Sequence, residues 1–425
     1  MIIHVVQKGD TISSIAQKYE IDEHRLIQDN GITNYDNLAV GQTIIIVHSK
    51  QVHTVIEGDT LQGIADQYGI SLIQLLRNNP YLLEREFIFP GETIVISYED
   101  EKIRKITTNG YVLPYVEKKI LEKNLLFLSY LSIFSYVVAE NGDLNDIDDI
   151  SVINLAKSYG VAPIMVITNL KEKGYDIEAA HNIIINQEFK NNFIENVLSV
   201  LKKKGYYAAN INFPYIETAD RKSFYEFITE FTEKLHNEGF KVIMTITPNT
   251  FELDSGNSHE EVDYSFLGRT LDGIILSHYD WAYPVDISTE MIPFYHNRNL
   301  VAYFASQIPP EKIMLAAITI GYIWELPFIE EVSKVNIISY TNAVVLASEA
   351  NVPILFNKLN LSSYYYLKNQ SLRQVTFYDA RGFKTYVHLI PDFNLQGLGI
   401  WNVMYDIQQT FFLINTQYDI ENSIQ

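Results

Sequence analysis

A short stretch near the start of the chain returns 49 residues later, and this repeat limits how the first hundred residues can fold. The sequence VVQKGDTISSIAQKYEI, at Val5–Ile21, returns as TVIEGDTLQGIADQYGI, at Thr54–Ile70, with Gly, Asp, Thr, Ala and Tyr at matching places. Self-similarity at a fixed period means that each copy is one structural unit. We call residues 1–49 unit 1 and residues 50–98 unit 2, and we expect one fold for both.

The pattern inside each copy predicts two strands around two helices. A short strand that contains His4 or His53 precedes a Gly-Asp-Thr turn, whose Asp or Thr can cap the helix that follows. A second helix includes Leu26–Asn30 in unit 1 and Leu75–Asn79 in unit 2. Each copy closes on a Gly-x-Thr-Ile-x-Ile strand, with one inserted residue in unit 2. This order predicts a βααβ fold.

The two units resemble LysM domains over nearly all of residues 2–97. LysM domains bind glycans that contain N-acetylglucosamine, such as peptidoglycan or chitin, in a groove between the loop after the first strand and the loop after the second helix. The resemblance implies ligand-binding residues at Gly9, Asp10, Thr11, Ile12, Asn30, Gly31 and Ile32, and at Gly58, Asp59, Thr60, Leu61, Asn79, Pro80 and Tyr81. In an alternative interpretation the Gly-Asp-Thr segments only form turns and caps, and the two asparagines only end helices. If both units reach one strand, tethering them raises avidity.

From about residue 103 the pattern changes to apolar strands that alternate with amphipathic stretches, which is typical of parallel βα units. The candidate strands are Gly110–Pro114, Leu128–Val138, Ala162–Thr168, Ala208–Phe213, Lys241–Thr247, Gly273–His278, Ile313–Ile320 and Gly397–Asn402. The longest apolar run, Leu125–Ala139, is short for a membrane span and is interpreted as a buried strand. We therefore predict an α/β chain: two βααβ domains, then a (β/α)8 TIM barrel with an insertion at residues 99–425.

The composition fits a large folded chain and disfavours some classes of partner. Of the 425 residues, 47% are hydrophobic, enough for a substantial core. The net charge of -20 disfavours nucleic acid and anionic membranes, but not neutral glycans. Because the chain has no cysteine, disulfides and thiolate metal sites are excluded. The histidines match no metal motif and no phosphate-binding glycine loop is present, so we expect neither metal nor cofactor.

One segment, GYYAANINFPY at Gly205–Tyr215, lies where a barrel keeps its ligand site. Because side chains alternate along a strand, Asn210, Asn212 and Pro214 would project from one face, into the lumen. Proline is uncommon inside a central strand, so Pro214 marks the carboxyl end of this one. Parallel barrels hold their ligands at that end. The segment therefore offers amides and a proline at a position suited to chemistry.

The same segment resembles the fourth barrel strand of glycoside hydrolase family 18, which carries Asp-x-x-Asp-x-Asp-x-Glu. Tyr207 stands at the first acidic position, while Asn210, Asn212 and Pro214 stand at the other three, so we expect no catalytic residue there. Further matches follow in the family's order at Asp220-Arg221, Ser277–Trp281, Gln307–Ile313, Gly321-Tyr322 and Gly399–Trp401. Together with the LysM-like units, this arrangement resembles the spore cortex-fragment-lytic N-acetylglucosaminidases.

The resemblance implies a specific chemical loss. Family 18 enzymes use the acetamide oxygen of the substrate as nucleophile, while the glutamate protonates the leaving oxygen and the aspartate two residues earlier orients the acetamide. Asn212 can hydrogen-bond an acetamide but carries no charge, and Pro214 cannot transfer a proton. Loss of general acid catalysis lowers the rate by about 10² to 10⁴. Glu217 could replace the acid only if its loop folds back, because three extended residues span roughly 10 Å.

The pocket that remains is aromatic and amide in character. Tyr279 and Asp280 match residues that the family places near the acetamide, and Trp401 matches the indole under the sugar. With Asn212, these are the predicted ligand-binding residues of the barrel, because aromatic faces stack on sugar rings and amides supply hydrogen bonds. In an alternative interpretation Trp401 and Tyr279 only pack the barrel.

Other features receive simpler interpretations. Tyr136 and Tyr322 are weaker pocket candidates, and the acidic run Asp143–Asp149 is interpreted as a solvated loop. The amino terminus, MIIHVVQKGD, has no basic region, long apolar stretch or cleavage site, so we expect no signal peptide. With the resemblance, this implies synthesis in the mother cell and deposition in the spore coat or cortex.

Three functions remain open. The favoured hypothesis is a pseudoenzyme that binds peptidoglycan, or another N-acetylglucosamine-containing glycan, in the spore envelope or cell wall. The first alternative is an active N-acetylglucosaminidase that acts on spore cortex peptidoglycan with a non-standard acid, Glu217 or Asp280. The second alternative is a spore coat scaffold, whose barrel binds coat proteins and whose units only localise it.

Overall fold

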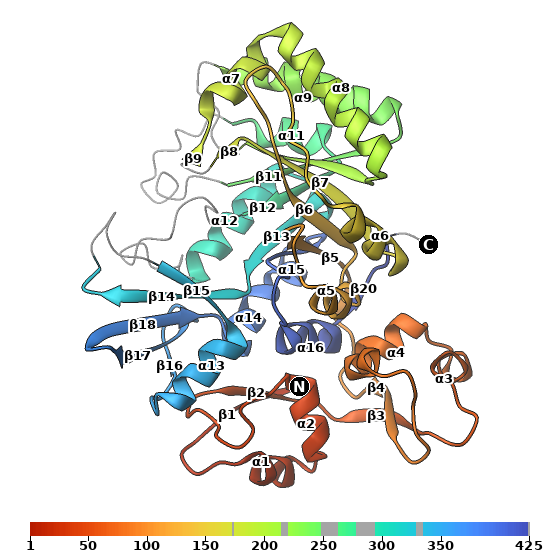
Figure 1. Ribbon diagram of the computed structural model, residues 1–425, viewed down its shortest axis with the longest axis vertical. Coiled ribbons are helices and arrows are strands. Elements are labelled where there is room, and N and C mark those ends of the chain that lie inside the picture. Colours follow the sequence, from red (N-terminus) through yellow and green to blue (C-terminus); the bar gives the residue numbers. More distant parts are fainter. Residues whose placement is uncertain (172–173, 214–219, 248–261, 278–293, 329–334, 424–425) are drawn as a thin grey trace.

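The computed structural model describes residues 1–171, 174–213, 220–247, 262–277, 294–328 and 335–423, and Figure 1 shows their arrangement. The two units have the predicted βααβ order, with each pair of strands antiparallel. Unit 1 contains β1 (Ile2–Val5), α1 (Ile12–Tyr19), α2 (Glu23–Asn30) and β2 (Thr43–Ile46). Unit 2 contains β3 (Ser49–Thr54), α3 (Leu61–Tyr68), α4 (Leu72–Asn78), the 3-10 helix η1 (Pro80–Glu84) and β4 (Thr93–Tyr98).

The remainder is built on a closed barrel of eight parallel strands, which confirms the predicted fold class. The strands are β5 (Arg104–Val112), β6 (Tyr130–Val137), β7 (Ala162–Thr168), β10 (Ala208–Asn212), β11 (Lys241–Ile246), β12 (Gly273–Leu276), β13 (Ile313–Ile318) and β19 (Gly397–Trp401). Pairing of β19 with β5 closes the barrel. A short strand, β20 (Tyr418–Ile420), pairs in parallel with the first residues of β5. Each predicted strand overlaps one of the eight.

Strand β5 begins six residues before the predicted Gly110. Its first half is polar, yet Thr108 and Asn109 are fully buried. The Thr108 hydroxyl donates to the Phe127 carbonyl at 2.6 Å, and the Ser132 hydroxyl donates to Asn109 Oδ1 at 2.9 Å. Because the Thr108 hydroxyl and Asn109 Oδ1 find partners inside the barrel wall, a polar stretch can form part of a buried strand.

Helices cover the outside of the barrel (Figure 1). They are α5 (Lys118–Leu125), α6 (Ile150–Ser158), α7 (Ile177–Ile185), α8 (Gln187–Lys204), α9 (Arg221–Asn237), α11 (Tyr264–Thr270), α12 (Phe294–Gln307), α14 (Ala380–Val387), α15 (Leu389–Asp392) and α16 (Gln408–Gln417). Short elements β8 (Leu170–Lys171), β9 (Gly174–Tyr175) and η3 (Pro310–Lys312) lie in the connections. Within the described ranges, no helix is long and apolar enough to cross a membrane.

The predicted insertion lies between β13 and β19 and forms a five-stranded antiparallel sheet with one helix. Its elements are β14 (Ile320–Leu326), β15 (Val335–Ser339), α13 (Tyr340–Glu349), β16 (Leu355–Phe356), β17 (Ser362–Lys368) and β18 (Ser371–Phe377). One face of the sheet packs on α13 through a separate apolar core that includes Ala343, Val344 and Val375.

Helix α16 joins the barrel to both units, and it lies directly beside them in Figure 1. Gln409, near its start, donates to Asn30 Oδ1 of unit 1 at 3.1 Å. Asn415, near its end, donates to Asn78 Oδ1 of unit 2 at 2.9 Å. Both α16 side chains are buried, so the units are docked on the barrel rather than carried on free linkers.

A buried arginine anchors unit 2 further. Arg77 of α4 is 5% exposed, and its guanidinium donates to the carbonyls of Leu126 at 2.6 Å and Ile420 at 2.9 Å. Burial lowers the pKa of Arg77 to about 10, which still leaves it charged at neutral pH. Buried backbone carbonyls at the start of the barrel are therefore satisfied by a side chain from another domain.

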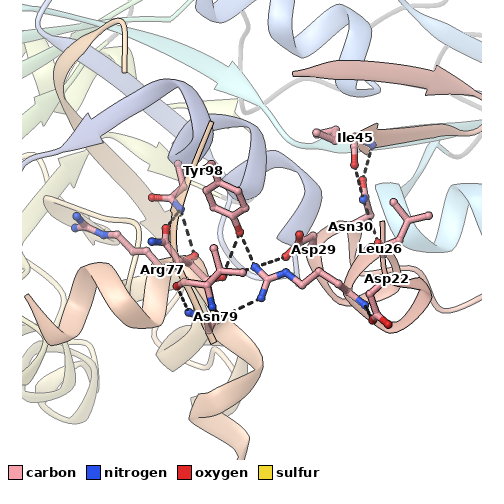
Figure 2. Close-up of polar contacts among 12 residues, drawn as sticks. Asp22, Leu26, Asp29, Asn30, Ile45, Arg77, Asn79 and Tyr98 are labelled. Atoms are coloured by element: carbon pink, nitrogen blue, oxygen red, sulfur yellow. Dashed lines mark hydrogen bonds and ion pairs between the residues drawn. The ribbon is translucent and has the colours of Figure 1, made fainter. Parts of the chain in front are cut away.

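A second arginine, whose side chain is 14% exposed, joins the units to each other, and its partners Asp29, Asn79 and Tyr98 are labelled in Figure 2. Arg25 of α2 donates to Asn79 Oδ1 at 2.9 Å, the Asn78 carbonyl at 2.5 Å and the Tyr98 hydroxyl at 2.6 Å, all in unit 2. Asp29, one turn later on α2, pairs with the same guanidinium at 2.7 Å. The charged group thus has acceptors from both units and fixes their relative position.

The interpretation of Asp143–Asp149 as a solvated loop is wrong at its last residue. Asp149 is fully buried on the outside of the barrel, where it pairs with Lys204 at 2.9 Å. The hydroxyls of Tyr136, at 2.7 Å, and Tyr206 donate to its other oxygen. Because three donors compensate the buried carboxylate, the charge is tolerated. Tyr136 points into this cluster, so its candidacy for the pocket is also wrong.

We predict that Arg25→Ala lowers the free energy of unfolding by about 3–5 kcal/mol, because it leaves the buried carboxylate of Asp29 without its cation. Chemical denaturation of the full chain measures this. The matched control is Arg298→Ala, which removes a pair with Asp392 whose side chains are 48% and 42% exposed, and is expected to change stability by less than about 1 kcal/mol. Equal losses in the two variants would contradict the proposed strength of the Arg25 contact.

We also predict a pH dependence that originates at Asp29. Burial, opposed by Arg25, raises the pKa of Asp29 to about 6 from its ordinary 3.8. A raised pKa contributes stability that is complete below the unfolded value and is lost as the pH rises through the folded value. The stability of the natural protein relative to Asp29→Asn should therefore fall between about pH 4 and pH 7. Denaturation curves across this range test the sign, and a relative stability that rises with pH would contradict it.

Candidate functional site

The lumen of the barrel is lined from one side of β10, as predicted. Ala208 packs in the lumen cluster with Ile164, Ile243 and Ile275 of neighbouring strands. The alternate residues Ala209 and Ile211 pack in the outer core instead. This alternation places Asn210 and Asn212 on the lumen side.

Asn210 takes part in a hydrogen-bond network inside the lumen. Its amide exchanges hydrogen bonds with the Thr245 hydroxyl at 3.0 and 3.1 Å, and its nitrogen lies 3.4 Å from the Tyr111 hydroxyl. The Tyr111 and Thr245 hydroxyls are 3.1 Å apart. Because burial raises the pKa of Tyr111, the phenol stays neutral. All three side chains are buried, so this part of the lumen is filled by uncharged groups that satisfy one another.

Asn212 is the last residue of β10, and its side chain is 3% exposed. The eight barrel strands, all within the described ranges, contain no Asp or Glu. No carboxylate therefore projects into the lumen from a strand. The predicted positions Pro214, Glu217, Tyr279 and Asp280 lie outside the described residues.

Trp401 lies at the carboxyl end of β19 and is partly exposed. Its ring centroid is 5.6 Å from that of Tyr111 and 5.4 Å from that of Phe134, both in the lumen cluster. Tyr322 packs at the edge of the same cluster. The structure thus brings Trp401 and Tyr322 to the lumen, where an aromatic face meets buried apolar side chains.

In both units the aspartate of the Gly-Asp-Thr turn is held by its own module. Asp59 accepts from the Ile56 N–H at 2.8 Å and lies 2.7 Å from Nε2 of His53, whose Nδ1 is 3.1 Å from the Tyr68 hydroxyl. Unit 1 repeats all these contacts around Asp10. The hydrogen bond from His53 lowers the pKa of Asp59. The carboxylate of Asp59 is consequently held by a backbone N–H and by a histidine, and the histidine is itself positioned by a tyrosine.

The threonines, rather than the aspartates, cap the first helices. The Thr60 hydroxyl accepts from the Gly63 N–H, and the Thr11 hydroxyl accepts from the Ser14 N–H, both at 3.0 Å. Gly9 and Gly58, which begin these turns, have φ values of 94° and 93°, a backbone region that residues other than glycine rarely adopt. Of the predicted ligand residues in these loops, Gly9, Thr11, Gly58 and Thr60 are exposed, Asp10, Asp59 and Leu61 are intermediate, and Ile12 is buried.

Asn30 and Asn79 occupy equivalent buried places and join the second helix to the closing strand. Asn79 Nδ2 donates to the carbonyls of Leu75 at 2.8 Å and Val95 at 2.7 Å, and its Oδ1 accepts from the Val95 N–H at 2.9 Å. Asn30 makes the same three contacts with Leu26 and Ile45 (Figure 2). Because the side-chain amides of Asn30 and Asn79 bind backbone groups of their own unit, the prediction of sugar contact rests on the other predicted ligand residues of each unit.

The neighbours of these asparagines differ between the units. Ile32 and Pro80 are buried, and Gly31 lies so close to α16 that an added Cβ would be 2.9 Å from Cβ of Gln408. Tyr81 is partly exposed, with the guanidinium carbon of Arg85 5.4 Å from its ring centroid.

The two arginines that dock the units, Arg25 and Arg77, were not predicted from the sequence. A signal was present, because Arg25 and Arg77 stand where the other copy has Gln74 and Gln28. A cation found in only one copy indicates a contact outside the repeated fold. The mismatch could not indicate which groups Arg77 binds, because Leu126 and Ile420 are distant from it in sequence.

Comparison with known families agrees with this geometry. The LysM domain matches residues 4–47 and 53–97, and glycosyl hydrolases family 18 matches residues 125–406. The chain belongs to glycosyl hydrolase family 18. Its two LysM domains are units 1 and 2, and its family 18 domain contains the barrel and the insertion.

Several relatives of this family 18 protein match nearly its whole length. It is 28% identical over 430 residues to "Cortical fragment-lytic enzyme" of Bacillus subtilis (strain 168), with 99% of each chain covered. It is 26% identical to "Putative sporulation-specific glycosylase YdhD" of the same organism, with 95% of each covered. Among solved structures, the spore cortex-lytic enzyme SleL of Bacillus megaterium QM B1551 matches with a TM-score of 0.81 and 25% identity, over 99% of this chain and 98% of that one.

We predict that Asn79→Ala destabilises the protein by about 3 kcal/mol, because it leaves buried backbone groups of Leu75 and Val95 without partners. Denaturant unfolding of the full chain measures the loss. Asn336→Ala, at an exposed position, is the control and should stay within about 0.5 kcal/mol of the natural protein. Weaker glycan binding by Asn79→Ala at unchanged stability would contradict the structural role.

Proposed function

We propose that this protein binds peptidoglycan of the spore envelope and that its barrel does not hydrolyse it. The coarse part of the function rests on the family: LysM and family 18 domains both support binding of a glycan that contains N-acetylglucosamine. The observation that carries the finer proposal is the lack of acidic residues on the barrel strands that the structure describes: Asn212 ends β10, and no barrel strand carries an Asp or Glu.

The physical reason is the missing proton donor. Cleavage of a glycosidic bond needs an acid within hydrogen-bonding reach of the leaving oxygen, and its absence lowers the rate by about 10² to 10⁴. An amide at the position of Asn212 can accept from or donate to an acetamide group, but it cannot stabilise the positive charge that develops on it. Substrate binding can therefore outlast catalysis.

Aromatic side chains support the binding part of the proposal. Trp401 presents a partly exposed indole beside Tyr111 and Phe134 at the carboxyl end of the barrel, where parallel barrels bind ligands. Such faces stack on the apolar sides of sugar rings. We place Asn212 and Trp401, with Tyr279 and Asp280, in this proposed sugar site.

The cellular setting is also a proposal. Relatives over the full length are named for the spore cortex and for sporulation. These names support synthesis in the mother cell and deposition in the coat or cortex. Coat proteins are further proposed partners.

A second candidate is an active N-acetylglucosaminidase. The observation in its favour is that the similar proteins carry the names of lytic enzymes. For this activity another carboxyl group, such as that of Glu217 or Asp280, would have to reach the leaving oxygen.

We predict that the natural protein releases no reducing ends from spore cortex fragments or from chitooligosaccharides, because no acid stands at the end of β10. A colorimetric reducing-end assay measures this, with the double variant Asn212→Asp, Pro214→Glu in parallel to restore the two acidic positions. Turnover by the natural protein would contradict the proposal, whatever the variant does.

Two controls sharpen this result. If turnover occurs, its loss in Glu217→Gln or Asp280→Asn identifies the acid and supports the second candidate. If no turnover occurs, weaker binding of a chitooligosaccharide by Trp401→Ala than by the natural chain supports a sugar site in the barrel. Unchanged binding would favour a barrel that serves only as a scaffold.

A further inference from the structure

The turn that leads into the closing strand is equivalent in the two LysM domains. We call residues 37–41 and 87–91 the closing turns of units 1 and 2. In each, the glycine N–H donates to the first strand, from Gly41 to the Val6 carbonyl and from Gly91 to the Val55 carbonyl, both at 2.8 Å. One residue later, a backbone N–H donates to the carbonyl of Ala39 or of Phe89, at 3.0 and 3.1 Å. The same backbone therefore presents different side chains in the two units.

The closing turn of unit 1 is covered by the insertion. The Ile354 N–H donates to the Val40 carbonyl at 2.8 Å, and the Ser348 hydroxyl donates to the Asn37 carbonyl at 2.5 Å. Ala39 is 3% exposed and packs in the core of the insertion. A Cβ on Gly41 would lie 2.0 Å from the Ile354 carbonyl oxygen. This face of unit 1 has no room for a ligand.

The second predicted binding loop of unit 1 is confined as well. Residues 30–34 line a small cleft whose other walls are α13 and α16. Gly31 lies against Gln408, as described above. Unit 1 therefore uses both surfaces to hold the barrel and the insertion in place, which leaves its Gly9–Thr11 turn as the exposed part of its predicted groove.

The closing turn of unit 2 is open and apolar. A Cβ on Gly91 would meet no atom within 4 Å. Phe87 and Phe89 replace Asn37 and Ala39 of unit 1, and they are 69% and 58% exposed. Ile56, which replaces a glutamine of unit 1, is 64% exposed and follows the Val55 carbonyl that binds this turn. Three large apolar side chains thus face solvent beside the Gly58–Thr60 loop.

We infer that unit 2 supplies most of the LysM affinity for glycan, with Phe87, Phe89 and Ile56 as an apolar platform beside its groove, while unit 1 acts mainly as a structural brace. This inference rests on the proposed function and assigns that function to one of two repeated domains. It also means that two LysM sequences do not make this protein bivalent.

The chemistry of the platform favours a neutral sugar as its occupant. Phenylalanine rings pack on the apolar faces of pyranose rings without needing a charge or hydrogen bond. The net charge of -20 and the flanking Glu57 and Glu86 disfavour acidic partners. Because Gly91 of the closing turn binds the Val55 carbonyl, three residues before the exposed Gly58 of the predicted groove, a glycan seated on the platform can extend towards that groove.

Titration calorimetry of the full chain with N-acetylglucosamine hexamer, and co-sedimentation with purified peptidoglycan, test the inference. The variant is Phe87→Ala, Phe89→Ala, and the matched control is Tyr35→Ala, which removes a 51% exposed aromatic ring from unit 1. We expect the double variant to bind at least about tenfold more weakly, and Tyr35→Ala to stay within about twofold. Since all three rings are exposed, thermal melting should confirm that both variants remain folded.

The outcomes separate the inference from the proposed function. If the natural protein binds neither probe, both fail. If it binds and the double variant binds equally well, the inference alone is overturned. If the double variant keeps its glycan affinity but loses self-association in light scattering, the platform is a protein-docking surface, and the inference is again overturned.

Discussion

A polar group buried in the barrel lumen destabilises the fold unless it finds a hydrogen-bond partner there. In this chain Asn210, Thr245 and Tyr111 satisfy one another, and none carries a charge. The eight barrel strands, all within the described residues, are thus held together without an Asp or Glu of their own. Trp401 lies beside Tyr111 and Phe134 at the carboxyl end of this lumen.

The same demand explains how the two LysM domains are attached. Each has a buried asparagine that ties helix to strand, and the remaining acceptor capacity of its oxygen is used outside the module. Asn30 accepts from Gln409 of the barrel, whereas Asn79 accepts from Arg25 of the other unit. One repeated residue thus serves two interfaces. The two repeats share one fold but differ in their surroundings. Unit 1 packs between the barrel and the insertion, whereas the closing turn of unit 2 is exposed.

Much of this architecture could be predicted from the residues. The barrel strands are runs such as Ala162–Thr168, whose continuous apolar character is typical of strands buried on both faces. The beginning of β5 could not be found this way, because Thr108 and Asn109 are polar and are buried only by virtue of partners on β6 and before it. Local pattern identifies an element, while tertiary partners decide whether a polar stretch can belong to it.

The features of the predicted site likewise differ in whether local sequence or tertiary contacts determine them. The lumen side of β10 followed from the alternation of residues 208–212, which is local. The structural role of Asn30 and Asn79 could not be predicted in this way, because their partners Ile45 and Val95 lie on the closing strand of each module. Docking through Arg25 and Arg77 depends on contacts between domains, which a repeat shows only as a mismatch between its copies.

We propose that no carboxyl group of this protein can protonate the bridging oxygen of a bound aminosugar. A crystal structure of the full chain with an N-acetylglucosamine oligomer in the barrel measures this directly. The account predicts that no carboxyl oxygen lies within about 3.5 Å of the glycosidic oxygen, while Trp401 lies under a sugar ring. A carboxyl oxygen of Glu217, Asp280 or any other acid at hydrogen-bonding distance from that oxygen would contradict it.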